Sequence, residues 1–98
     1  MKEQILSKAA IKDLKIINKK HYQDIDFIEE ELNKYLIDQF KADGNKIKEF
    51  TNYNPSLFRL RINAVESYRV YFRILENCFF IERIILKKDS EKILKNII

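Results

Sequence analysis

The chain has 98 residues, of which 46% are hydrophobic and 12% aromatic, so it can build one modest core but is too short for two. Charged residues make up 35% with both signs mixed and a net charge of +4, which excludes a disordered polyelectrolyte. A single cysteine excludes an internal disulfide and a metal site made of several cysteines. We therefore expect one cytoplasmic domain over residues 1–98, with no metal or other cofactor, no signal peptide and no membrane span.

The N-terminal half predicts a short strand followed by a first helix. Residues 3–7 can form the strand, and Ser7 suits a helix N-cap because its hydroxyl can accept a hydrogen bond from an unpaired backbone N–H. Apolar residues then recur at helical spacing as far as Ile17. Residues 18–21 predict a break in the helix.

A second, longer helix is expected after this break. It begins near Asp24 or Asp26, and Glu29 three residues after Asp26 resembles a capping box. Its apolar stripe steps by three or four residues. The stripe consists of Ile25, Ile28, Leu32, Leu36 and Phe40. Gly44 is the expected C-terminal stop, because glycine adopts the left-handed conformation without strain.

The pattern then changes from helical to strand spacing. Residues 57–62 and 68–74 alternate between apolar and polar side chains, which predicts two half-buried strands. Residues 76–77 can close a hairpin, and the nearly continuous apolar run 78–86 suits a strand covered on both faces. A helical period returns from Asp89. We predict an α+β fold of order β-α-α-β-β-β-α, with the N-terminal helical pair packed on one face of a small, mostly antiparallel β-sheet.

The other face of this sheet is predicted to be basic and free of helices. The excess positive charge lies in residues 51–98, which hold nine Lys or Arg against five Asp or Glu and include all five arginines. Strand alternation collects seven side chains on this face. They are Arg59, Arg61, Arg69, Tyr71 and Arg73, joined by Arg83 and Lys87 from the last strand.

This basic face is interpreted as a surface for single-stranded nucleic acid. Arginine suits phosphate because its planar fork donates two parallel hydrogen bonds and keeps its charge, and aromatic rings can stack on unpaired bases. Only Glu66, Glu76 and Glu82 are acidic in the strand region, so few partners for the arginines are expected. The alternative is a solvated face whose charges protect the sheet from aggregation.

The same strands resemble the RelE/ParE toxin superfamily. The resemblance runs through residues 57–61, 67–74 and 81–88, and residues 7–14 resemble the start of the family's first helix, so it covers nearly the whole chain. It implies the toxin of a type II toxin–antitoxin pair, neutralised by a cognate antitoxin. Many members cut mRNA on the ribosome, whereas members of the ParE type inhibit DNA gyrase without cutting RNA.

The resemblance also implies site residues. By position, the basic residues of the ribonuclease members correspond to Arg59, Arg61, Arg69 and Lys87 or Lys88. In the implied reaction, which needs no metal, the RNA 2′-hydroxyl attacks the adjacent phosphate and leaves a cyclic phosphate and a free 5′-hydroxyl. We assign catalysis to four residues that stabilise the transition-state charge: Arg61, Arg69, Lys87 and Lys88. RNA binding is assigned to Arg59, Tyr71, Arg73 and Arg83, and the candidate proton acceptors and donors are Lys87, Lys88, Tyr71 and Glu66.

Two departures from the family pattern keep other functions open. The family's best-known ribonuclease has a tyrosine in the last helix, where this chain has an aliphatic residue near Ile93 or Leu94. It also has paired lysines where Arg59 and Arg61 stand, and arginine is a poor general base because its pKa stays above ~12. The alternatives are a ParE-like inhibitor of DNA gyrase and a degenerate nucleic-acid-binding member of the family.

The remaining candidates are given structural roles. His21 is expected to be a solvated turn residue, and Cys78 to pack in the core. Phe27, Tyr35 and Phe79 or Phe80 are interpreted as ordinary core, or as antitoxin contacts if they are exposed.

Overall fold

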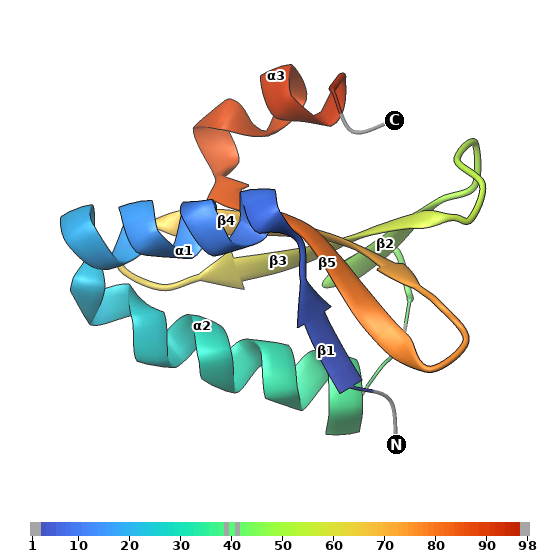
Figure 1. Ribbon diagram of the computed structural model, residues 1–98, viewed down its shortest axis with the longest axis horizontal. Helices are drawn as coiled ribbons and strands as arrows, with labels where there is room; N and C mark the ends of the chain where they lie inside the picture. Colours follow the sequence, from blue (N-terminus) through green and yellow to red (C-terminus); the bar gives the residue numbers. More distant parts are fainter. Residues whose placement is uncertain (1–2, 39, 41, 97–98) are drawn as a thin grey trace.

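The computed structural model describes residues 3–38, 40 and 42–96. Eight regular elements make up the fold, and Figure 1 shows their arrangement. They are β1 (Glu3–Leu6), α1 (Lys8–Lys20), α2 (Ile25–Leu32), β2 (Ile47–Phe50), β3 (Leu57–Asn63), β4 (Ser67–Ile74), β5 (Cys78–Leu86) and α3 (Ser90–Leu94). Short 3₁₀ turns at Tyr22–Asp24 and Lys87–Asp89 precede α2 and α3, and a π-helical turn at Asn33–Asp38 follows α2.

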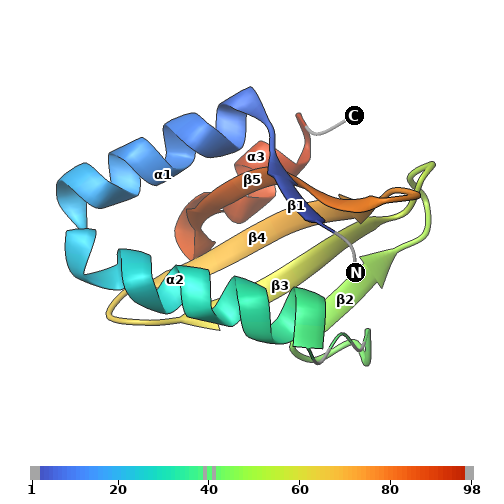
Figure 2. The ribbon, with the colours of Figure 1, turned by 60° about the horizontal axis from the view of Figure 1, so that its bottom comes forward.

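The sheet has five strands in the order β1-β5-β4-β3-β2. β1 runs parallel to β5 and the other three pairings are antiparallel, so the predicted α+β class is confirmed. Both N-terminal helices pack on the sheet, with α1 along β5 and α2 across the middle strands (Figure 2). No helix in the described part of the chain is long and apolar enough to cross a membrane.

The N-terminal elements begin largely where the sequence predicts. β1 is present, and the Ser7 hydroxyl caps α1 by accepting a hydrogen bond from the backbone N–H of Ala10 at 3.0 Å. The break lies later than predicted, since α1 continues to Lys20 and residues 21–24 connect it to α2. The prediction of a capping box at Asp26 is wrong, because α2 already begins at Ile25 and Asp26 lies in its first turn.

The segment after α2 differs most from the prediction. Helical structure ends at Asp38, and Gly44 instead supplies a turn into an unpredicted strand, β2. Gly44 has a φ of 86°, which only glycine adopts without strain, and its N–H donates to the carbonyl of Ile47 at 2.9 Å. A strand of four residues gives too short a pattern to recognise alone, and β2 forms because β3 offers it a partner edge.

The main core lies between the two N-terminal helices and the sheet. It is centred on aromatic rings, with Phe58 stacked on Phe72 at 5.4 Å and Phe79 edge-on to Phe72 at 6.1 Å. Phe79 and Cys78 are therefore ordinary core residues, as the structural interpretation of the sequence predicts. Phe27, in contrast, is exposed on α2.

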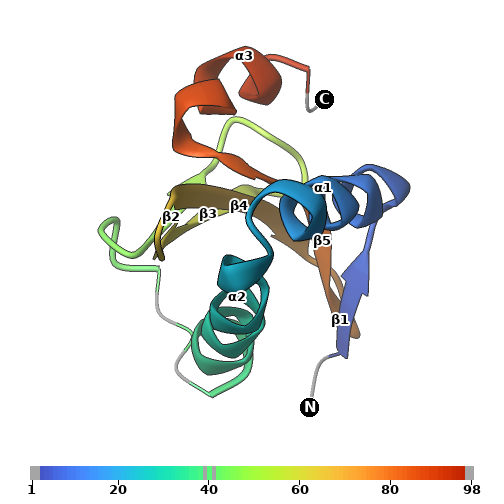
Figure 3. The same cartoon turned by 90° about the vertical axis from the view of Figure 1, so that its left-hand side faces the viewer.

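A second, smaller core lies on the opposite face of the sheet. Leu57, Tyr71 and Ile85 are buried there beneath Ile93 and Leu94 of α3. Figure 3 shows α3 on one side of the sheet and α2 on the other. The expectation that this face is free of helices is therefore wrong, because the apolar side chains of the last helix need a surface on which to pack.

Candidate nucleic-acid interface

Three arginines lie together on the face of the sheet that carries α3. Arg61 on β3 is directly opposite Arg69 on β4, and Arg59 is directly opposite Tyr71. Directly opposed residues on antiparallel strands have Cβ atoms roughly 5 Å apart, so these side chains are immediate neighbours. We call Arg59, Arg61 and Arg69 the arginine triad.

The triad concentrates positive charge without a carboxylate partner among the residues that the structure describes. Burial lowers the pKa of Arg69, and the nearby charge of Arg61 lowers it further. The pKa of Arg59 is lowered by burial and then by Arg61 and Arg69. Guanidinium groups nevertheless stay protonated at neutral pH, so the three charges repel one another unless an anion lies between them.

The hydrogen bonds of the triad are also incomplete. Arg69 is only 8% exposed, and its Nη1 donates to the carbonyl of Tyr68 at 2.9 Å. Arg59 donates from Nη2 to the carbonyl of Asn45 at 3.4 Å. The buried Nε atoms of Arg59 and Arg61 have no hydrogen-bond partner within the described residues. Since buried donors are nearly always paired, these two leave the hydrogen bonding of the triad incomplete within the described residues.

Tyr71 lies beside the triad but beneath α3. Its side chain is 3% exposed and hydrogen-bonds with that of Ser90. Burial raises the pKa of Tyr71, although the bond to Ser90 and the charges of Arg59 and Arg69 oppose this shift. The phenol is therefore neutral at pH 7 and suits a proton donor better than an acceptor. In this conformation its ring is too buried to stack on a base.

The other two arginines have acidic partners, contrary to the expectation from the sequence. Arg83 forms two parallel bonds to Asp13 of α1, with Nε–Oδ2 at 2.8 Å and Nη2–Oδ1 at 2.9 Å, and these bonds raise its pKa. Arg73 pairs with Glu82 at 3.3 Å and donates to the carbonyl of Pro55 at 2.8 Å. Both guanidinium groups are held by the fold and are less available to a ligand than the triad.

Lys87 and Lys88 follow β5 in the 3₁₀ turn and are both exposed. Neither forms an ion pair with any residue in the described ranges. They line a groove of about 490 Å³ together with His21 and the β3–β4 hairpin residues Val65, Glu66 and Ser67. Leu86, the last residue of β5, is opposite Tyr68, so Lys87 lies near the end of β4 from which Arg69 projects.

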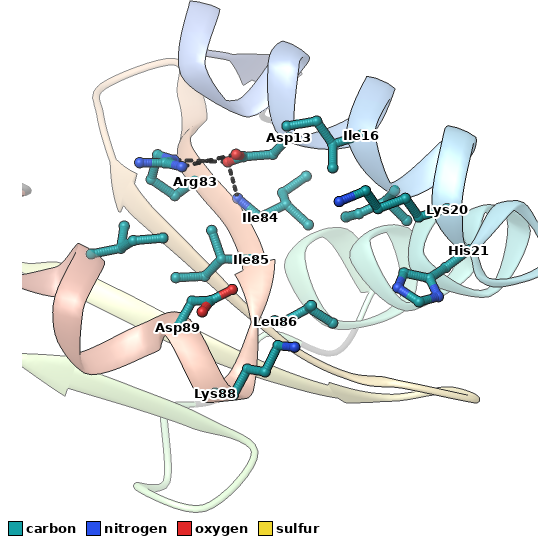
Figure 4. Close-up of a pocket in the computed structure, with 12 residues that line it drawn as sticks. Asp13, Ile16, Lys20, His21, Arg83, Ile84, Ile85, Leu86, Lys88 and Asp89 are labelled. Carbon is teal, nitrogen blue, oxygen red and sulfur yellow. Dashed lines mark hydrogen bonds and ion pairs between the residues drawn. The ribbon is translucent and has the colours of Figure 1, made fainter.

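A second groove of about 390 Å³ separates α1 from α3. Figure 4 shows Asp13 and Lys20 of α1 on one side of it and Lys88 and Asp89 on the other, with Ile84 and Ile85 of β5 between them. His21, Leu86 and Lys88 line both grooves. The two grooves therefore meet at the end of β5.

His21 is more enclosed by the fold than the sequence predicts. It ends α1, is half-buried, and forms part of both groove walls, whereas a solvated turn was predicted. No local signal could have placed it, because in both grooves the walls outside α1 come from residues more than forty positions away in the chain.

Asp24 anchors the hairpin that carries Arg61 and Arg69. Its buried carboxylate accepts hydrogen bonds from the N–H groups of Val65 and Glu66, both at 3.1 Å, and from the hydroxyl of Tyr68 at 2.7 Å. Burial raises the pKa of Asp24, but these three hydrogen bonds outweigh it and the net shift is downward. Burial and the bond to Asp24 raise the pKa of Tyr68. The hairpin is therefore held rigidly against the α1–α2 junction.

No cluster of His, Cys, Asp and Glu side chains in the described part of the chain could hold a metal ion. Comparisons with protein-family models, with curated proteins and with solved structures gave no match to this chain.

Proposed function

We propose that this protein is the toxin of a type II toxin–antitoxin pair and that it binds and cuts mRNA on the ribosome. The observation that carries the proposal is the arginine triad, in which three arginines occupy neighbouring positions on one face of β3 and β4 without an acidic partner in the described residues. Like charges directly opposed across strands destabilise a sheet. A phosphate bound between them removes this repulsion.

The chemistry of the triad suits phosphate in RNA cleavage. When the 2′-hydroxyl attacks, negative charge accumulates on the pentacoordinate phosphorus centre, and preorganised cations stabilise that charge more than the charge of the substrate. Arg61 and Arg69 can contact the phosphate from two strands, and Lys87 lies near Arg69 at the end of β5. A cognate antitoxin would neutralise the toxin by covering this face.

A second candidate is a ParE-like inhibitor that binds DNA gyrase without cleaving RNA. It is favoured by the acid–base properties of the triad, since arginine does not give up its proton at neutral pH and the pKa of Tyr71 is raised. The candidate proton acceptors, Glu66, Lys87 and Lys88, line the adjacent groove instead of the triad itself. A third candidate is a degenerate family member that binds nucleic acid alone.

Expression of the protein in a bacterial host distinguishes the three. Wild type is compared with Arg69→Gln and Lys87→Gln, and Lys12→Gln provides a control because Lys12 is exposed on α1 outside both grooves. Growth arrest with halted translation and cut mRNA, lost in the first two variants and kept in the control, is the expected result. Arrest with DNA breaks and intact mRNA would support gyrase inhibition, and the absence of toxicity would support the third candidate.

Folding of each variant is checked by circular dichroism and thermal unfolding, because Arg69 is largely buried. A folded Arg69→Gln variant that remains as toxic as the wild type would contradict the assignment of the triad. Arg69→Lys tests whether positive charge alone is sufficient for toxicity, because lysine keeps the charge of arginine but lacks its planar, two-pronged donor group.

A further inference from the structure

The groove beside Lys87 and Lys88 is large enough for one nucleotide. Its volume of about 490 Å³ lies within the range of small-molecule sites, roughly 300–1,000 Å³. It is formed where the β3–β4 hairpin, the end of β5 and the α1–α2 junction meet, so three separate segments contribute to its walls.

The side chains in the groove match the parts of a nucleotide. Lys87 and Lys88 supply two cations without an ion-pair partner in the described residues, which suits a phosphate. Glu66 is the one carboxylate in the lining, and it can accept hydrogen bonds from base N–H groups or ribose hydroxyls. Val65, which is 73% exposed, presents an apolar surface to one face of a base.

Hydrogen bonds within the fold hold the hairpin wall of the groove in place. The Asp24 carboxylate holds the backbone N–H groups of Val65 and Glu66, and the N–H of Ala64 donates to the carbonyl of Glu66 at 2.9 Å. Because these bonds come from the fold itself, they fix the wall and lower the entropic cost of binding a ligand.

The groove continues the surface of the arginine triad. Ser67, which lines the groove, and Arg69, which belongs to the triad, are two residues apart on β4 and therefore share a face. Two strand residues span roughly 6.8 Å, a distance comparable to one nucleotide step along an extended strand. A phosphate on the triad and the next nucleotide in the groove can thus belong to the same strand.

We infer that this groove is a nucleotide subsite, which holds one unpaired nucleotide of an RNA strand whose neighbouring phosphate lies on the arginine triad. The inference rests on the proposed function and extends it. It gives Lys88 a phosphate contact, Glu66 a contact to base or ribose, and Val65 a contact to the face of the base. Because the groove accepts one nucleotide from the side of an open strand, it selects single-stranded RNA over a duplex.

The test uses an RNA tetranucleotide with a 2′-O-methyl group at every position, which blocks attack by the 2′-oxygen and allows binding to be measured alone. Affinity is measured by titration for wild type, Lys88→Gln, Val65→Ser and Arg61→Gln, with Lys12→Gln as the matched control. We expect Lys88→Gln to weaken binding roughly tenfold, as for the loss of one charge-assisted hydrogen bond, and to reduce the salt slope by about 0.7.

A second set of probes tests the contact to the base. Each probe replaces one nucleotide of the tetranucleotide by an abasic ribose. We expect Val65→Ser to weaken binding of the intact probe about threefold, in line with the loss of a small apolar contact. We expect no effect of Val65→Ser on the probe that lacks the base held in the groove.

Two results would overturn the inference. If Lys88→Gln and Val65→Ser bind as tightly as Lys12→Gln while Arg61→Gln binds weakly, the groove is not a subsite and the triad alone binds RNA. If Arg61→Gln also binds like the control, the RNA-binding function fails together with the subsite.

Discussion

Two regions of the molecule treat buried charge in opposite ways. Where α1 and α2 meet the strands, the carboxylates of Asp13 and Asp24 are each surrounded by three hydrogen-bond donors. On β3 and β4, Arg61 and Arg69 are directly opposite each other without an acid among the described residues. Charges with partners stabilise the fold, whereas charges without partners suit the proposed ligand site. We therefore predict that mutations of the two aspartates cost stability, whereas mutations in the triad cost binding.

The largest expected effect is the loss of stability in Asp24→Asn. The amide keeps the size of the carboxylate but loses its charge and places an NH₂ group among three donors. We expect the free energy of unfolding to fall by about 3 kcal/mol, measured by urea denaturation at pH 7. RNA affinity of the folded fraction should be reduced less than in Arg61→Gln, because the triad itself is intact.

The effect of Asp24→Asn should depend on pH in a defined direction. The pKa of Asp24 is lowered in the folded protein from its ordinary value of 3.8, so its stabilisation is complete above that value and is lost as the pH falls through the lowered pKa. The difference in stability between wild type and Asp24→Asn should therefore be constant near neutral pH and shrink below about pH 4. A difference that grows on acidification would contradict the assignment.

The second expected effect is a smaller loss of stability in Asp13→Asn. This change removes the negative charge and replaces one of the two acceptor oxygens by an NH₂ donor, so the carboxylate can no longer accept both Arg83 bonds and the bond from the N–H of Ile84, which lies 2.9 Å from Oδ2. The side chain of Arg83 is 28% exposed and can be partly solvated, so we expect a loss of about 2 kcal/mol. Arg83→Gln with Asp13→Asn provides the double-mutant cycle, and full additivity of the two changes would show that the ion pair is not coupled.

The smallest expected effect has the opposite sign. Arg61→Gln removes one of two directly opposed like charges, so we expect the free energy of unfolding to rise by about 0.5 kcal/mol while RNA binding weakens. Arg83→Gln is the matched comparison and should lower stability, because Arg83 has an acidic partner. A loss of stability in Arg61→Gln would show that the triad is structural, and the contrast between the two regions would disappear.

Much of the fold could be predicted because the signals are local. Ser7 caps α1 as its place in the sequence suggests, and the period of two in β3 and β4 correctly places Phe58 and Phe72 against the helices. The same parity places Arg59, Arg61 and Arg69 together on the other face. Each of these predictions depends on interactions within a few residues or on the alternation of one strand.

The other parts of the site could not be predicted, because they depend on contacts between distant segments. The acid that holds Arg83 lies seventy residues earlier in the chain, and its helix could not be placed from periodicity alone. His21 becomes part of a groove wall only when α1 packs near the β3–β4 hairpin. Tyr71 is likewise buried only when α3 packs over it. The strand β2 was missed because four residues carry too little pattern without a partner.

The sequence alone determined which side chains share a face of the sheet, because strand geometry sends every second residue to the same side. Only the tertiary structure decided which of those charges are neutralised. The electrostatic environment of a guanidinium depends on neighbours within a few ångströms, and those neighbours come from other parts of the chain. Arg61 and Arg83 look alike in the sequence, yet one faces another arginine and the other a buried aspartate.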